Sequence, residues 1–327
     1  MLQVTSNGLY CVPGDFYIDP YRSVPTAVIT HGHADHARWG MGHYISTPMT
    51  ADIMRIRIGK DISVTAHEYH APFDLNGVRV TLIPAGHILG SAQVVLEHNN
   101  QRSIITGDFK TDDDPTVQPF EAMPCDLLVM ETTFALPIYH WPSASDVMAD
   151  IHAFWQQNQV AGEHTVLYAY SLGKAQRLVA GLDSTVGPVA VHRAVDNMNQ
   201  VYKQYGFLDN LPPVLTKSVL EDWDRPGIII APPATQGSTW LKTLGRYREA
   251  YVSGWMLSRG QTRRRNMRGF VLSDHADWAG LNATVAACAP TQVWTMHGST
   301  HIYAKYLQEQ GIAATPLGAL ALERSEE

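Results

Sequence analysis

Hydrophobic and polar positions alternate over short segments in the first 130 residues, and these segments lead into polar side chains. Apolar or alternating runs of this length are typical of buried or half-buried strands. The predicted strands cover residues 26–31, 78–87, 92–98, 102–109 and 126–132. Asn76-Gly77 strongly indicates a β-hairpin, and residues 51–59 indicate a helix between strands. We therefore expect a mainly β layer in this part of the chain.

From about residue 141 the pattern changes to an alternation of strands and helices. An amphipathic helix is predicted over residues 143–159, with Ser143 or Ser145 as the N-cap. Strands at 164–170, 188–192 and 227–233 are each followed by a predicted helix, at 171–182, 196–206 and 238–245. Such alternation predicts a small parallel α/β unit. A strand, helix, strand and helix follow at 269–274, 278–289, 292–298 and 300–311.

Composition places the chain among globular proteins. It has 327 residues, of which 45% are hydrophobic and 17% charged, enough for one large or two medium domains. No apolar stretch approaches the roughly 20 residues that span a bilayer, and the N-terminus lacks the pattern of a signal peptide. Three cysteines with no close pair in the sequence fit a reducing cytoplasm. We therefore expect a cytoplasmic protein without membrane association.

Charge narrows the function only slightly. The net charge of −7 argues against a protein that coats nucleic acid non-specifically. It leaves a nuclease open, because only the substrate groove of a nuclease must be basic. The acidic run at residues 112–114 is expected to be a solvated loop.

Four side chains that can bind metal lie within six positions, directly after the first predicted strand: His31, His33, Asp35 and His36. His-x-His places two imidazoles on one side of an extended segment, while the next two side chains turn toward a different point. One loop can therefore serve two metals, and zinc accepts both imidazole and carboxylate ligands. A polar surface loop is the alternative, but the full pattern after a strand favours a metal site.

Further strand ends carry residues of the same chemistry. His87 follows an apolar strand and precedes a glycine-rich turn, and Asp108 follows another strand. A carboxylate at that place could bridge two metals about 3.5–4 Å apart. Asp19 is another acidic strand end, which could orient a ligand histidine. Each residue alone fits a capped strand end, whereas together they predict a two-metal hydrolytic site.

These motifs resemble the metallo-β-lactamase fold, and more narrowly its β-CASP nuclease branch. The segments AGHILGSA and TGD are similar to that branch, and AYSLGKAQRL resembles the strand–helix signature of the β-CASP insert. Glu131 in LLVMETTF resembles the acidic motif A, His275 in LSDHADW resembles motif B, and His297 in WTMHG resembles motif C. The matches extend over residues 19–297.

The resemblance implies a metallo-β-lactamase αββα sandwich with an inserted small parallel α/β domain. The sandwich is expected over residues 1–140 and 270–327, and the β-CASP insert over 141–269. The segments GDFKTDDDPTVQPFE and ETTFALPIYHWP look most like the bacterial ligase-associated DNA exonucleases, compact relatives of the Artemis-type repair nucleases. Ala135 departs from this pattern, where glycine is expected, and adds only a methyl group to a turn.

The resemblance also implies two divalent metal ions, expected to be zinc with manganese as the alternative. Its ligand set is His31, His33 and His87 for one metal, Asp35, His36 and His297 for the other, and Asp108 for both. A hydroxide between the two metals is expected to attack phosphorus in line with the leaving 3′ oxygen. His275 is the expected general acid, and Glu131 is expected to hold its imidazole and favour the protonated form.

Several of these roles have structural alternatives. Glu131 could be a capping or turn residue, and His275 a helix-start histidine bonded to a neighbour. Asp274 and Asp277 flank His275, and either could orient a ligand. His301 lies four residues after the motif C histidine, so it could share a helix face with it and either orient a ligand or contact phosphate.

Helix starts and an arginine run are the candidates for substrate binding. Ser171 is expected to begin a helix with Lys174 in its first turn, a position that favours a phosphate. Ser238 and Thr239 are expected to begin another helix, although ordinary N-capping explains both starts equally well. Residues 246–268 hold seven arginines and one glutamate. The consecutive Arg263, Arg264 and Arg265 are the candidate nucleic-acid track, with a solvated loop as the alternative.

Three aromatic residues could stack on bases or belong to the core: Tyr139, Tyr251 and Trp255.

The resulting hypothesis is a metal-dependent exodeoxyribonuclease of DNA repair that hydrolyses single-stranded DNA from 5′ to 3′. An ATP-dependent DNA ligase and a helicase are partners implied by the resemblance. The alternative is an RNA-processing β-CASP ribonuclease of the RNase J or polyadenylation-nuclease type. The motif C histidine favours this alternative, whereas the short chain favours the DNA type. A small-ester hydrolase and a non-catalytic scaffold are disfavoured by the insert and by the intact ligand positions.

Overall fold

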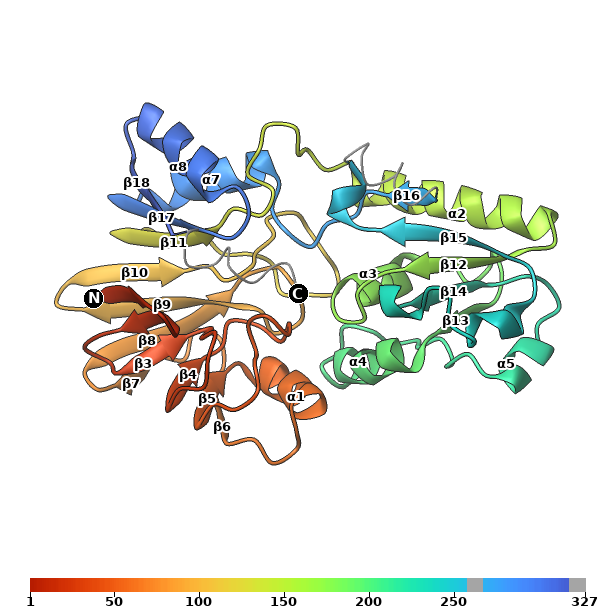
Figure 1. The fold of residues 1–327 in the computed structure, drawn as a ribbon, viewed down its shortest axis with the longest axis horizontal. Coiled ribbons are helices and arrows are strands. Elements are labelled where there is room, and N and C mark those ends of the chain that lie inside the picture. The colour runs from red at the N-terminus through yellow and green to blue at the C-terminus, as the bar shows by residue number, and fades with distance from the viewer. Residues whose placement is uncertain (258–266, 318–327) are drawn as a thin grey trace. The chain divides into compact units, whose positions relative to one another are not determined.

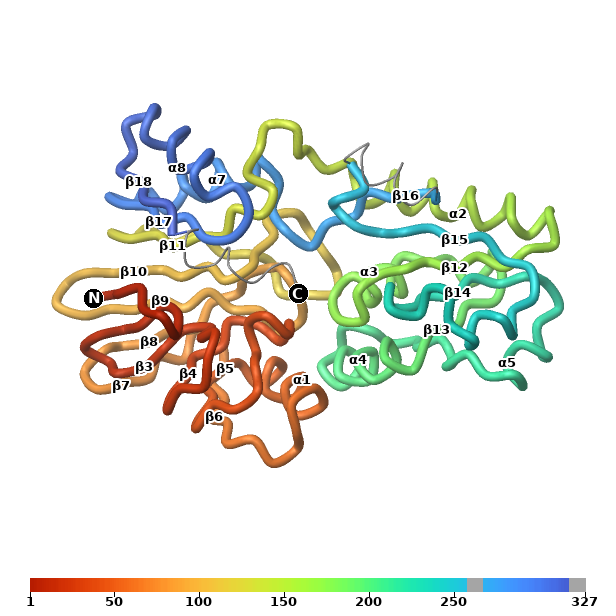
Figure 2. The backbone as a smooth tube through the Cα atoms, viewed as in Figure 1, coloured from red at the N-terminus to blue at the C-terminus, as the bar shows by residue number. Residues whose placement is uncertain are grey.

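The computed structural model describes residues 1–257 and 267–317, and the chain forms two compact units. The first unit contains Met1–His140 and continues from His275, and the second is Trp141–Asp274. The chain enters the second unit once and returns once, so the first unit is built from both ends of the sequence (Figure 2). Among the described residues, no helix has both the length and the apolar character needed to cross a membrane.

Two mixed sheets form the centre of the first unit (Figure 1). The described part of the first sheet has six strands: β1 (Leu2–Thr5), β2 (Gly8–Cys11), β3 (Phe16–Ile18), β4 (Thr26–Val28), β5 (His43–Ser46) and β6 (Val64–Ala66). The first three strands are antiparallel, and the sheet is parallel from β3 to β6.

The second sheet has seven strands within the described residues. In spatial order they are β18 (Ala313–Pro316), β17 (Gln292–Met296), β11 (Leu127–Glu131), β10 (Gln101–Ile105), β9 (Ala92–His98), β8 (Val78–Pro84) and β7 (Phe73–Leu75). β7 to β10 are antiparallel neighbours, and β10, β11, β17 and β18 are parallel. Asn76 and Gly77 join β7 to β8 with φ values of 52° and 82°, so the predicted hairpin is confirmed.

Alternating side chains place each sheet between two apolar layers. Val94 and Leu96 of β9 pack in the cluster that also contains Val28 of the first sheet, whereas Val95 packs with Leu281 and the other buried residues of the C-terminal helices. These helices are α7 (Trp278–Cys288) and α8 (Thr300–Glu309), and α1 (Pro48–Arg57) covers the first sheet. The four layers form an αββα sandwich.

The second unit has a parallel sheet, with five strands in the described residues. Their order is β13 (Val189–Val191), β14 (Ile228–Ala231), β12 (His164–Tyr168), β15 (Tyr247–Val252) and β16 (Arg268–Phe270). One face packs on α2 (Ala144–Val160), α3 (Lys174–Gly181) and α4 (Arg193–Gln204). The other face packs on α5 (Lys217–Glu221) and the 3₁₀ helices η2 (Leu241–Leu244) and η3 (Gly254–Leu257), and η1 (Pro233–Thr235) follows β14.

The pattern of hydrophobic and polar residues predicted most of these helices and strands. Ser143 is the N-cap of α2 and accepts a hydrogen bond from the backbone N–H of Asp146. The α-helix predicted at 238–245 is wrong, because only the short η2 forms there. Gly237 and Gly245, with φ values of 71° and 72°, flank the segment, and the 3₁₀ turn within it covers only Leu241–Leu244. The strand predicted at 269–274 contributes β16 to the second unit, which therefore extends to Asp274.

The observed architecture confirms the expected fold class, a metallo-β-lactamase-type αββα sandwich with an inserted parallel α/β unit.

Candidate metal centre

The ends of several strands of the first unit supply the candidate metal ligands. His87 follows β8, Asp108 follows β10, Glu131 ends β11, and His297 follows β17. β8 runs in the same direction as β10, β11 and β17, because two antiparallel pairings separate β8 from β10. Their carboxyl ends therefore meet at one edge of the sheet. The histidines after β4, in the first sheet, complete the group.

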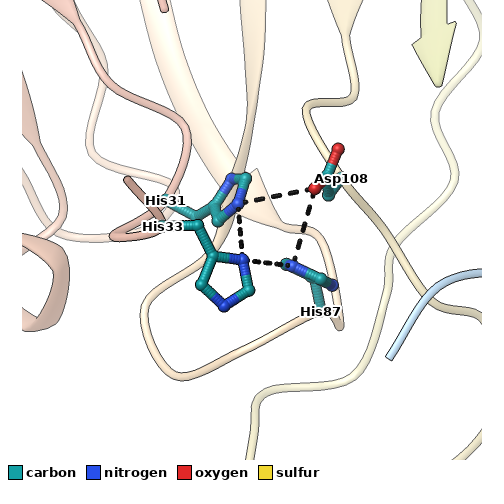
Figure 3. A group of neighbouring side chains, drawn as sticks. All are labelled: His31, His33, His87 and Asp108. Atoms are coloured by element: carbon teal, nitrogen blue, oxygen red, sulfur yellow. Dashed lines mark hydrogen bonds and ion pairs between the residues drawn. The ribbon is translucent and has the colours of Figure 1, made fainter. Parts of the chain in front are cut away.

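His31, His33, His87 and Asp108 converge on one point (Figure 3). The Nδ1 atom of His33 lies 3.1 Å from the Nε2 atoms of both His31 and His87. The Oδ2 atom of Asp108 lies 3.6 Å and 3.7 Å from the same two Nε2 atoms. Donors about 2.0–2.1 Å from a tetrahedral zinc ion lie about 3.3 Å apart. The donor set and its spacing therefore fit a divalent cation.

A second group shares Asp108. His36, Asp108 and His297 each offer a donor atom, all within 4.8 Å of one another. The Oδ2 atom of Asp108 lies 3.5 Å from Nε2 of His36. Asp35 is in neither group: its side chain is 68% exposed, and its Oδ2 atom lies 3.6 Å from Nε2 of His36. The structure thus places Asp108 where one carboxylate can contact two neighbouring cations.

Asp19 orients two of the histidines. Its Oδ2 atom accepts hydrogen bonds from the Thr30 hydroxyl, at 2.5 Å, and from Nδ1 of His36, at 2.7 Å. Because the Thr30 hydroxyl donates to Asp19, it is an acceptor for the Nδ1–H of His31, 3.0 Å away. Both imidazoles therefore hold Nδ1 against an oxygen of Thr30 or Asp19 and turn Nε2 toward Asp108.

The electrostatics of the site centre on the buried Asp108 carboxylate. Burial holds the pKa of His31 well below 6.5. Burial acts in the same direction on His36, but the carboxylates of Asp108 and Asp19 outweigh it and raise the pKa of His36 well above 6.5. Burial opposes ionisation of Asp108, yet the charge of His36 lowers its pKa well below 3.8. An ionised carboxylate surrounded by imidazoles and shielded from water is a suitable ligand for a divalent metal.

Glu131 and His275 form a pair beside these ligands. The buried carboxylate of Glu131 accepts the backbone N–H of Phe109 at 2.8 Å. Nδ1 of His275 lies 2.8 Å and 2.9 Å from its two oxygens. Asp108, Glu131 and His275 also offer donor atoms within 4.8 Å of one another. Glu131 thus holds the His275 ring by Nδ1, close to the bridging carboxylate.

The two aspartates that flank His275 have other partners. Asp277 accepts the backbone N–H of Gly280 at 2.8 Å and is the N-cap of α7. Asp274 lies 2.5 Å from Nζ of Lys174, and both side chains are about 95% buried. Neither aspartate orients a metal ligand through these contacts.

Glycine is required beside two of the strand-end residues. Gly86, which precedes His87, has φ 72°, and a Cβ atom there would lie 2.2 Å from the backbone oxygen of Lys110. Gly107, which precedes Asp108, has φ 55°, and its Cβ would lie 2.6 Å from Oγ1 of Thr30. At both positions the glycine backbone lies so close to a neighbouring residue that a side chain would not fit, and this close packing helps to position His87 and Asp108.

The expectations for substrate binding require correction at several positions. Lys174 is buried and paired with Asp274, so its ammonium is not presented to a phosphate. Ser171 does not cap a helix, because α3 begins at Lys174 with Gly173 as the N-cap. Ser238 and Thr239 precede the short η2 and not an α-helix. Arg263, Arg264 and Arg265 lie outside the described residues.

His301 does not share a helix face with His297. β17 ends at Met296, His297 has φ 56°, and α8 begins at Thr300. His301 is exposed on α8 and belongs to none of the donor groups found among the described residues. The left-handed turn at His297 separates the two histidines.

The aromatic candidates divide between core and surface. Tyr139 and Tyr251 are buried, whereas Trp255 is 41% exposed. The sequence pattern did not predict a role for two residues near the candidate metal ligands. Thr30 links His31 to Asp19 by hydrogen bonds, and Trp39 is 80% exposed. Thr30 directly precedes His31 in the sequence, and this position could have indicated that its hydroxyl contacts a candidate ligand.

Known proteins resemble this chain in fold and, more closely in some cases, in sequence. No protein-family model matches the chain. A crystal structure of a protein of unknown function from Enterococcus faecalis V583 superposes with a TM-score of 0.62 over 89% of this chain and 78% of that one, at 12% identity. This likeness shows the fold alone.

Three curated relatives add sequence similarity. A "Probable DNA ligase" from Opitutus terrae is 32% identical over 320 residues, which are 96% of this chain and 31% of that protein. An "Endoribonuclease YSH1" from Eremothecium gossypii is 31% identical over 121 residues, 36% of this chain and 15% of that one. The "DNA cross-link repair protein SNM1" from Arabidopsis thaliana is 26% identical over 156 residues, 45% of this chain and 32% of that one. The chain thus spans a third or less of the length of these relatives.

The αββα sandwich with histidine and aspartate donors at its strand ends defines a metal-binding protein of the metallo-β-lactamase fold. The inserted parallel unit and the relatives narrow this class. The chain belongs to the metallo-β-lactamase/β-CASP nuclease family.

Proposed function

We propose that this protein is a metal-dependent exodeoxyribonuclease that hydrolyses single-stranded DNA from its 5′ end during DNA repair. The observation that carries the proposal is the convergence of two donor groups on Asp108, with the Glu131–His275 pair beside them. Phosphodiester hydrolysis needs an activated water, neutralisation of charge on the phosphate, and a proton for the leaving oxygen. The site supplies a group for each need.

Two divalent cations, zinc or manganese, would be held by His31, His33 and His87 on one side, by His36 and His297 on the other, and by Asp108 between them. When bound, they would polarise a water molecule and offset the negative charge of the phosphate. Asp35 is proposed to complete the second set, because its Oδ2 atom lies 3.6 Å from Nε2 of His36. Asp19 holds His36 directly and His31 through Thr30, so that Nε2 of each ring faces Asp108.

His275 is proposed to protonate the departing 3′ oxygen. An alkoxide is a poor leaving group, so a positioned acid accelerates its departure. The Glu131 carboxylate accepts from Nδ1 and favours the imidazolium form of His275. The proton on Nε2 can then be donated to the substrate.

The preference for DNA is supported by the relatives. The chain is similar over 96% of its length to a part of a protein named "Probable DNA ligase". A polypeptide that carries such a segment together with a ligase would trim a DNA end before sealing it. We therefore propose an ATP-dependent DNA ligase as a functional partner, with a helicase of the same repair system, and a cytoplasmic location. The similarity to "Endoribonuclease YSH1" supports RNA as the alternative substrate.

The test uses purified protein with Mn²⁺ or Zn²⁺ and matched DNA and RNA single strands labelled at either end. We expect mononucleotides from the 5′ end of DNA, intact RNA, and no reaction with a chelator. His33→Ala should abolish hydrolysis, and His98→Ala, a histidine outside the donor groups of the described residues, should not. Preferential or internal cleavage of RNA would replace the DNA proposal with an RNA-processing one. Full activity of His33→Ala would overturn the metal site.

A further inference from the structure

Trp39 presents an unusual side chain three residues after His36. Its indole is 80% exposed, compared with 60% for Tyr170 and 41% for Trp255. Tryptophan buries a large apolar area when it packs in a core, so an indole this exposed is left without that stabilisation. Its position next to the candidate metal ligands raises the question of what covers it.

Hydrogen bonds fix the backbone on both sides of Trp39, whereas the Trp39 side chain is exposed. The Tyr44 hydroxyl donates to the backbone oxygen of Arg38 at 2.7 Å and accepts the N–H of Met41 at 3.2 Å. Ala37 donates its N–H to the oxygen of His33 at 2.8 Å. Ala37, Met41 and Tyr44 are all buried in the cluster under α1. The loop is therefore anchored on both sides, and little conformational entropy would be lost when a ligand stacks on the indole.

Positive charge surrounds this loop. Arg38 precedes Trp39 and donates its Nε–H to the backbone oxygen of Asp35 at 3.1 Å. The neighbouring loop brings the exposed Arg22 close, because a Cβ atom on Gly40 would lie 2.8 Å from Oγ of Ser23. An exposed aromatic ring with arginines on its own and the neighbouring loop is a combination that suits single-stranded nucleic acid, in which the bases stack and the phosphates pair with the cations.

We propose that Trp39 stacks on a nucleobase of the single-stranded substrate close to the scissile phosphate. The inference rests on the proposed function, because the metal centre supplies the phosphate-binding site beside it. Trp39 lies three positions after His36, and a segment of that length spans at most about 10 Å between its Cα atoms. The stacked base therefore belongs to one of the nucleotides next to the cleaved bond. Stacking is tolerant of sequence, so Trp39 selects unpaired strands over duplex and not one base over another.

The test combines a protein variant with a substrate variant. Single strands carry either normal bases or an abasic sugar at one of the first nucleotides, together with hydrolysis-resistant phosphorothioate linkages. Fluorescence anisotropy with the metal-loaded protein then gives Kd without cleavage. We expect Trp39→Ala to weaken binding of the intact strand about 5- to 150-fold. Trp39→Phe should retain most of the affinity. The abasic strand should bind wild-type protein and Trp39→Ala equally, and Ile302→Ala, an exposed residue on α8, should leave both strands unaffected.

Each result separates the inference from the proposed function. If Trp39→Ala weakens intact and abasic strands equally, the indole supports the loop and does not stack. If wild-type protein cleaves DNA and Trp39→Ala binds it normally, the indole is covered by something else, such as a protein partner, and the stacking proposal is overturned. If wild-type protein neither binds nor cleaves any single strand, the proposed function itself fails. A 2-aminopurine base at the same nucleotide should lose fluorescence on binding wild-type protein and not on binding Trp39→Ala.

Discussion

Replacing Lys174 with methionine tests whether this lysine stabilises the second unit or binds substrate. Its ammonium is 2.5 Å from the Asp274 carboxylate, and the two side chains are 5% and 4% exposed. Removing one partner of a buried ion pair leaves an unpaired buried charge, which costs about 3–5 kcal/mol. Arg177, 4.0 Å from the other oxygen of Asp274, would compensate part of that charge. We therefore expect the lower end of the range, about 3 kcal/mol.

The assay is thermal and denaturant unfolding of the full chain. A loss of about 3 kcal/mol corresponds to a Tm lowered by about 10 °C for a unit of this size. Lys217→Met is the matched control, because Lys217 also begins a helix of the second unit and pairs with an acid, Glu221, at 3.5 Å. Its side chain is 87% exposed, so we expect a change below about 0.5 kcal/mol. The double variant Lys174→Met/Asp274→Leu should regain part of the lost stability, because the buried carboxylate of Asp274 is no longer left without its ammonium partner.

A loss below about 1 kcal/mol for Lys174→Met, equal to that of Lys217→Met, would refute this reasoning. If the same variant weakened DNA binding at unchanged stability, the phosphate-binding role expected from the sequence would be restored. The two explanations thus predict opposite results in the same two measurements.

Other predictions concern the metal site and pH. Asp108→Asn should lower the metal bound per chain and abolish hydrolysis, as measured by metal analysis and nuclease assay, whereas normal metal content would exclude the bridging role. Asp19→Asn should reduce metal affinity about 10- to 100-fold in a chelator competition. Glu131→Gln should slow turnover about 10²- to 10⁴-fold with metal content unchanged. Unchanged turnover would show that the Glu131–His275 pair does not supply the proton for the leaving oxygen. Arg248 holds the pKa of Glu163 below 4.5, so the stability from this pair is present above about pH 4.5 and lost as the pH falls through the lowered pKa. The Tm difference between wild type and Glu163→Gln should therefore be largest near pH 6 and shrink as the pH falls below about 4.5.

Local pattern was sufficient for much of the fold. Alternating or continuous apolar residues predicted β8 to β11. Each of these strands packs against one apolar layer on each face, and successive side chains point to opposite faces. Asn76-Gly77 predicted its hairpin because few residues adopt two consecutive left-handed conformations. The helix predicted at 238–245 is wrong because only Leu241–Leu244 forms a helical turn, of the 3₁₀ type, and a residue pattern over so short a segment does not distinguish this turn from an α-helix.

Charged residues were harder to interpret, since their partners lie far away in the sequence. Lys174 and Asp274 are separated by 100 positions, and no local pattern joins them. The acidic run at 112–114 was expected to be solvated, yet the Asp114 side chain is 3% exposed and lies 3.0 Å from the buried Lys110 ammonium. The candidate ligands were predictable by contrast, because each stands at a strand end in a short motif. Their exact donor atoms depend on hydrogen bonds, such as those of Asp19, that only the structure contains.

The position of His297 in the sequence has a consequence for biosynthesis. The second donor group needs this histidine, whereas His36 and Asp108 precede the inserted unit at residues 141–274. A chain that is still being translated therefore carries an incomplete centre until the insert and β17 have been made. If hydrolysis needs both donor groups, as proposed, it would begin only after the insert and β17 have been translated, whereas the first donor group is encoded entirely before the insert.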